Sequence, residues 1–90
     1  MKNAKKVLNK QTKKILEYTA VFEKAPEGGY NVYFPSLPGC FTFGVSLKHA
    51  KEMAKDVLSL WLGVLKEKNN KIPEQKEILL TSIRVAFSKK

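Results

Sequence analysis

Apolar and polar residues alternate along four stretches of the chain. In the first stretch every second residue from Leu16 to Phe22 is apolar or aromatic, and the opposite face carries Glu17, Thr19, Val21 and Glu23. An alternation with a period of two, rich in β-branched and aromatic residues, is typical of strands with one buried face. We therefore expect strands over residues 15–24, 30–34, 40–43 and 77–88.

Glycine and proline separate the first three of these stretches. Gly28 and Gly29 follow Pro26 and Glu27, and adjacent glycines supply the positive φ angles that a hairpin connection needs. The run from Pro35 to Gly39 contains two prolines with fixed φ, which predicts a stiff turn between the second and third strands. Gly44 closes the third strand.

A different period follows in the second half of the chain. From Leu47 to Leu65 apolar residues recur at spacings of three and four, which predicts an amphipathic helix of about 20 residues. Ser46 is a good N-cap, and the glutamate of a capping box is replaced by His49. Pro73 prevents the helix from continuing.

The predicted order is β-β-β-α-β, a two-layer α+β sandwich of an antiparallel meander and one long helix. Ninety residues make a single domain with a modest core, which favours oligomers. We divide the chain into a Lys-rich N-terminal arm or short helix over residues 1–14 and a domain over 15–88.

The net charge of +9 is concentrated at the ends of the chain. Residues 1–14 hold six lysines and no acid, whereas residues 15–88 hold nine basic and eight acidic residues. Two interpretations stay open: a solvated arm, or an arm that contacts an acidic partner or a phosphate backbone. In the second case the candidate nucleic-acid contacts are Lys5, Lys6, Lys10, Lys13 and Lys14.

Hydropathy and cysteine usage bear on location. No stretch approaches the roughly 18 apolar residues of a membrane span, and no apolar run of a secretory signal follows the basic start. A single cysteine cannot form an internal disulfide. We therefore expect a cytoplasmic protein without a membrane contact.

The residues that carry chemistry are few and scattered. Cys40 and His49 could in principle pair as nucleophile and base, but their positions favour structural roles. Glu52 and Asp56 are interleaved with lysines, as on a solvated helix face. We expect no catalytic residue, no metal site and no cofactor. A residual hydrolase would lose activity on Glu23→Gln or His49→Ala.

Four aromatic residues lie in the second and third predicted strands. They could form a stacking platform for single-stranded RNA. Few basic residues accompany them, so packing in a core or an oligomer is the favoured interpretation. The four are Tyr30, Phe34, Phe41 and Phe43.

The run from Gly28 to Gly44 resembles the pattern of the HicB-like antitoxin family. That pattern has an acid-Gly-Gly hairpin, an aromatic strand, P-x-L-P-G-C and then T-x-G, and the helix after Ser46 is similar to the family's helix. The resemblance covers residues 16–87. Its signature residues, taken as determinants of the fold, are Gly28, Gly29, Tyr30, Phe34, Pro35, Leu37, Pro38, Gly39, Cys40, Gly44 and Trp61.

This resemblance implies a partial RNase H-like fold without the RNase H catalytic acids. It also implies a module that binds a HicA-like toxin, an mRNA-cleaving ribonuclease with a catalytic histidine, and blocks it by occlusion. Family members usually form dimers or tetramers. They also carry a C-terminal DNA-binding module, for which the roughly 17 residues after Pro73 are too few. The alternative is an orphan oligomeric module that binds nucleic acid through its N-terminal lysines.

Overall fold

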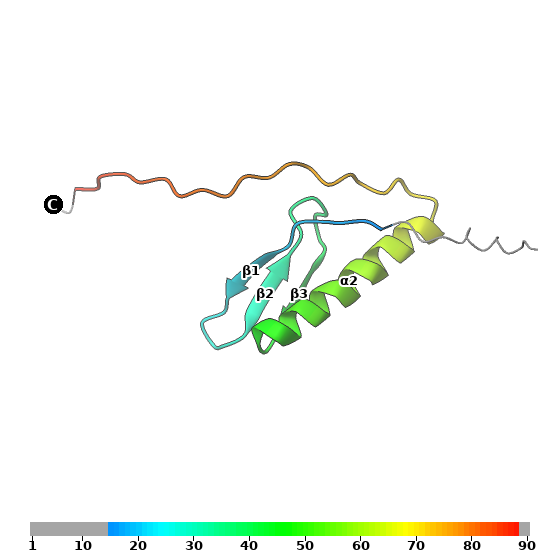
Figure 1. Cartoon of the computed structure of the whole chain (residues 1–90), viewed down its shortest axis with the longest axis horizontal. Coiled ribbons are helices and arrows are strands. Elements are labelled where there is room, and N and C mark those ends of the chain that lie inside the picture. The colour runs from blue at the N-terminus through cyan, green and yellow to red at the C-terminus, as the bar shows by residue number, and fades with distance from the viewer. Residues whose placement is uncertain (1–14, 89–90) are drawn as a thin grey trace, which may run out of the picture.

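A three-stranded antiparallel sheet followed by one long helix forms the body of the protein (Figure 1). The computed structural model describes residues 15–88. The elements are β1 (Val21–Lys24), β2 (Tyr30–Tyr33), β3 (Phe41–Gly44) and α2 (Leu47–Glu67), with the strands in the order β1-β2-β3. The predicted α+β class and the meander are confirmed. The predicted N-terminal arm or helix lies outside the described residues.

The register of the sheet separates an inner and an outer face. Phe22 and Thr42 are the neighbours of Val32 across the two ladders, and Val32 is buried. Side chains alternate along a strand, so Tyr33 and its partner Phe41 lie on the opposite face, where both are exposed. The helix therefore covers the inner face and leaves the outer face to solvent.

The core lies between the inner face and the first half of α2. Small residues on the helix allow a close approach: a Cβ built on Gly44 would lie 2.3 Å from the backbone of Ala50. The helix packs mainly on β3 and β2. The buried cluster consists of Val32, Phe34, Leu37, Cys40, Ala50 and Ala54.

The strand β1 is shorter than the alternation predicted. Its ladder begins at Val21, paired with Tyr33, rather than at Ile15. The Phe34 N–H points to the other neighbour of β2 and donates to the carbonyl of Cys40. Pro35, the next residue after β2 that would face β1, has no N–H to donate, and the Thr19 N–H donates to Gln75 instead.

The predicted hairpin and helix start are confirmed. Gly28 and Gly29 have φ angles of 110° and 81°, and the N–H of Ala25 donates to the carbonyl of Gly29 at 2.9 Å. The side chain of Ser46 accepts from the N–H of His49 at 3.1 Å. The helix ends where Asn69 adopts a positive φ of 59°.

The predicted final strand over residues 77–88 is wrong for the single chain. Residues 70–88 form no strand, and Figure 1 shows them running beside the body and well past its end. A strand exists only in a ladder, and no part of the described chain pairs with this segment. Its large apolar side chains are instead exposed by 72–86%, namely Leu79, Leu80, Ile83, Val85 and Phe87.

Candidate binding surfaces

The P-x-L-P-G-C stretch, residues 35–40, contributes buried side chains to the core. Backbone hydrogen bonds run from the Leu37 N–H to the Phe34 carbonyl and from the Cys40 N–H to the Leu37 carbonyl, both at 2.9 Å. These bonds turn three apolar side chains inwards, and each is at most 3% exposed. Pro35 and Pro38 lie at the surface between them. The turn is thus built around its own buried side chains.

Three other signature residues also contribute contacts to this part of the fold. Gly39 has a φ of 92°, and a Cβ there would lie 3.2 Å from Cη2 of Trp61. The indole of Trp61 therefore packs directly on the turn. Tyr30 is partly buried against the same core. The structure places the signature residues in turns and packing contacts, without gathering their polar groups into a cleft.

Cys40 and His49 each have a structural partner. Burial raises the pKa of the Cys40 thiol, which favours the uncharged form and lowers its reactivity. His49 Nδ1 accepts a hydrogen bond from the Val45 N–H at 3.0 Å, while its own N–H donates to Ser46. The imidazole thus accepts from the residue before the N-cap, whereas the glutamate of a capping box accepts from the N–H of the N-cap residue itself.

The acidic residues do not come together. Within residues 15–88 no three His, Cys, Asp or Glu side chains are close enough to hold a metal ion. The same part of the chain contains no helix apolar enough over a sufficient length to cross a bilayer. The candidate nucleic-acid contacts Lys5, Lys6, Lys10, Lys13 and Lys14 lie outside the described residues.

The outer face of the sheet is the first candidate surface. It presents exposed aromatic and aliphatic side chains on β2, β3 and the residue that follows β3. Within it Phe41 is 68% and Val45 71% exposed. We call this area the outer sheet face and define it by Tyr33, Phe41, Phe43 and Val45.

The favoured interpretation of the aromatic residues holds for only part of the set. Phe34 is in the core and Tyr30 packs against it, but Phe41 and Phe43 face solvent in the single chain. The register between β2 and β3 separates the two pairs. Phe41 and Phe43 flank Thr42, which is the cross-strand neighbour of the buried Val32.

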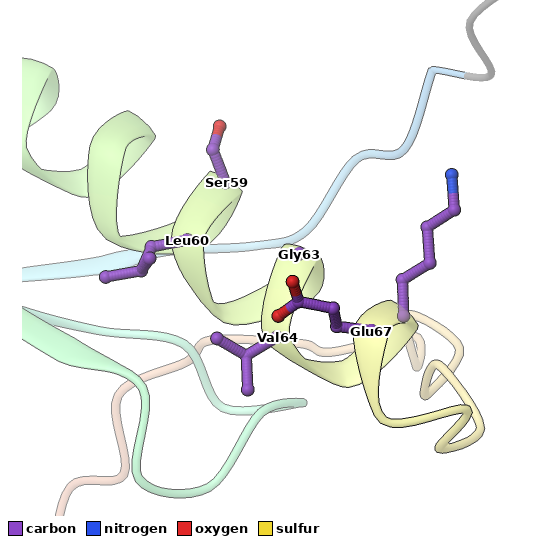
Figure 2. Close-up of a pocket in the computed structure, with 6 residues that line it drawn as sticks. Ser59, Leu60, Gly63, Val64 and Glu67 are labelled. Atoms are coloured by element: carbon purple, nitrogen blue, oxygen red, sulfur yellow. The ribbon is translucent and has the colours of Figure 1, made fainter.

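The second candidate surface is a small ridge on the C-terminal half of α2. Figure 2 shows Leu60 and Val64 leaving the helix on the same side, with Ser59 pointing away from them. Shallow depressions of about 490 and 370 Å³ share these two residues. The ridge is apolar but narrow, and its rim carries Lys66 and Glu67.

The third candidate surface is the C-terminal segment, residues 77–88. It follows a stretch that is tied to the body by several hydrogen bonds. The Tyr18 hydroxyl donates to the Pro73 carbonyl, and the Thr19 N–H donates to Gln75 Oε1 at 2.9 Å. The Lys76 N–H donates to Ser36 Oγ at 3.2 Å. The chain is therefore held as far as Lys76 and extends away from the body after it.

Comparison with known proteins confirms the resemblance carried by residues 28–44. A family model described as HicB_like antitoxin of bacterial toxin-antitoxin system matches residues 18–89. The match includes the sheet, the helix and the C-terminal segment. The exposed segment thus lies within the region that the family model covers.

Individual relatives fall into two groups of different length. A UPF0150 protein of Thermoplasma acidophilum is 40% identical over 58 residues, which are 64% of this chain and 84% of that protein. Antitoxin HicB 1 of Photorhabdus laumondii is 40% identical over 67% of this chain but only 39% of its own length. Antitoxin HicB of Escherichia coli K12 is 38% identical over 64% of this chain and 42% of its own length.

Proposed function

The chain belongs to the HicB-like antitoxin family, and on that basis we propose that it binds a HicA-like toxin and inhibits it by steric occlusion. The toxin would be a small mRNA-cleaving ribonuclease, and the antitoxin would cover its RNA-binding surface and its catalytic histidine. Since mRNA is its target, the encounter belongs in the cytoplasm. The proposed mechanism requires no chemistry from this chain.

The observation that carries the proposal is the outer sheet face. An aromatic area exposed on a small protein marks an interaction site more often than a solvated surface. Residues 15–88 carry nine basic and eight acidic side chains, so a strong electrostatic attraction for a basic toxin is absent there. Binding would therefore depend on shape and apolar contact, with Phe41 as the most exposed aromatic anchor of the sheet.

Co-expression with a HicA-like protein from a neighbouring reading frame tests this proposal. We expect the two proteins to co-purify and the pair to rescue growth that the toxin alone arrests. The variant Phe41→Asp should lose both effects. Leu60→Asp is the matched control, because Leu60 is 67% exposed on α2 and the charge change is the same. Equal loss in both variants, or co-purification that survives Phe41→Asp, would reject the outer sheet face as the contact.

A second candidate function is nucleic-acid binding by the N-terminal lysines. Its support is the concentration of six lysines without an acid in residues 1–14. Neutralising about six phosphates predicts a steep decrease of affinity with salt, close to five powers of the salt concentration for duplex DNA. Filter binding of the full chain to duplex DNA and single-stranded RNA at several salt concentrations tests it. Binding that is absent, or insensitive to salt, would exclude this function.

A further inference from the structure

The C-terminal segment has the composition of a strand and lacks a ladder. From residue 79 on, its odd-numbered positions carry Leu79, Thr81, Ile83, Val85 and Phe87, while its even-numbered positions carry Leu80, Ser82, Arg84 and Ala86. The odd positions form the more apolar face, and its four large apolar side chains are each at least 80% exposed. An extended apolar segment in this state is unfavourable for an isolated molecule.

Length and attachment direct the segment away from its own sheet. Twelve extended residues span about 40 Å, whereas a four-residue strand of the sheet spans about 13 Å. The stretch before it is fixed to Thr19 and Ser36, so its starting point cannot slide along the body. Figure 1 shows the segment passing well beyond the sheet. It is therefore placed to reach another molecule.

The free edge of β1 is the receiving site that best fits this geometry. Both β1 and β3 are edge strands, and each offers unpaired backbone groups. Gln75 holds the chain beside Thr19, two residues before β1, and Lys76 beside Ser36 in the turn after β2, so the segment leaves its own body at the end of the sheet where β1 begins. In a twofold-symmetric pair, two β1 edges can face each other and the segments can cross directly. Reaching β3 would require each segment to pass over a sheet face.

We propose that residues 77–88 of one copy add as a strand along the β1 edge of a second copy, which returns its own segment in the same way. The apolar odd-numbered face would then lie on the inner side of the sheet, next to Phe22 of the receiving copy. Each copy donates twelve residues and receives twelve, which together approach the roughly 20–30 residues per side of a stable interface. This strand exchange goes beyond the proposed toxin binding, because it concerns a different surface and partner.

Light scattering of the full chain across a range of concentrations tests the association. We expect a dimer or a multiple of it. Ile83→Lys should shift the dissociation constant by at least tenfold towards the monomer, because it puts a charge on the apolar face. Ser82→Lys adds the same charge on the opposite face and should stay associated. A monomeric wild-type chain, or equal effects of the two variants, would overturn the proposal.

An equimolar mixture of two isotope-labelled copies distinguishes exchange from docking on the chain's own sheet. Filtered nuclear Overhauser spectra should show contacts between the Ile83 or Val85 methyl groups of one copy and Phe22 of the other. Such contacts found only within one copy would contradict the exchange. A segment that becomes protected only when a HicA-like toxin is added would assign it to the toxin instead. Toxin binding by the Ile83→Lys variant is measured in parallel, and its loss or survival reports separately on the proposed function.

Discussion

The turn from Phe34 to Cys40 and the C-terminal segment both consist largely of apolar residues, yet the chain treats them in opposite ways. In the turn every third residue is buried, and backbone hydrogen bonds connect these residues to one another. In the C-terminal segment the large apolar side chains are exposed and the backbone has no ladder. Apolar content therefore reports the capacity for burial, while local hydrogen bonding decides whether one chain can achieve it.

Truncation of one leucine in each region gives the largest expected contrast. Leu37 is 1% exposed and Leu79 is 86% exposed. Leu37→Ala should lower the free energy of unfolding by about 2–5 kcal/mol, because it removes buried contacts and leaves a cavity. Leu79→Ala should change it by less than about 0.5 kcal/mol in the monomer.

Urea denaturation measures this contrast at protein concentrations below any association. The comparison depends on the monomer, since Leu79 would be buried in a dimer formed by strand exchange. At high concentration Leu79→Ala should therefore become destabilising as well. If Leu37→Ala lowers the free energy of unfolding as little as Leu79→Ala under dilute conditions, the Leu37 side chain does not pack in the core as the structure indicates.

Two glycines extend the contrast to backbone packing. A Cβ at Gly44 meets the Ala50 backbone at 2.3 Å, whereas a Cβ at Gly63 on the exposed side of α2 meets nothing within 4 Å. Gly44→Ala should cost about 1–3 kcal/mol through overpacking of β3 against the helix. Gly63→Ala should gain up to about 1 kcal/mol, because alanine favours a helix interior.

Thermal unfolding of the two alanine variants, followed by circular dichroism, provides the measurement. The substitution is identical, so only the surroundings of the added methyl group differ. A Gly44→Ala protein that melts with or above the wild type would show that β3 and α2 do not pack as closely as the structure indicates.

The sequence was informative where local chemistry decides the structure. The hairpin at Gly28–Gly29, the Ser46 cap and the 21-residue helix all depend on neighbouring residues, and all were predicted. The start of β1 was not, because it depends on Pro35 having no N–H to donate and on Thr19 bonding to the distant Gln75. The final strand failed for a related reason. Its alternating pattern indicates which face would be buried, but it does not identify the strand with which the segment would pair.

The same distinction applies to the candidate surfaces. The structure places Phe34, Leu37 and Cys40 in the turn, and Trp61 meets Gly39 there, a contact that the sequence pattern did not specify. The exposure of Phe41 and Phe43 depends instead on the register between β2 and β3, which a single sequence does not specify. The surfaces available for partners were therefore the least predictable part of the molecule.

The buried Cys40 thiol in the turn predicts a smaller, pH-dependent effect on the free energy of unfolding. Burial raises the Cys40 pKa above its ordinary value of 9.0, so the folded state holds this proton more tightly than the unfolded state. The corresponding stability is present below that pH and is lost as the pH rises through the folded-state pKa. The free energy of unfolding should thus fall more steeply above pH 9 in the wild type than in Cys40→Ala. Parallel slopes for the two proteins would show that the thiol is not protected by the core.

The smallest expected effect concerns His49, which caps the helix at the border between the buried core and solvent. Its Nδ1 accepts from the Val45 N–H, so His49→Ala should cost about 0.5–1 kcal/mol by leaving that donor without its protein partner. His49→Glu should retain or exceed the wild-type stability, because its carboxylate can accept from the Ser46 N–H as in a capping box and complements the positive end of the helix dipole. Urea midpoints of the three proteins at neutral pH measure the order. If alanine and glutamate are equivalent, the imidazole acts as a spacer and its hydrogen bond contributes nothing. The expected order, in contrast, would show that the body of the protein satisfies its backbone donors as far as the exposed start of α2. The C-terminal segment differs, because no group within the described residues 15–88 pairs with its backbone.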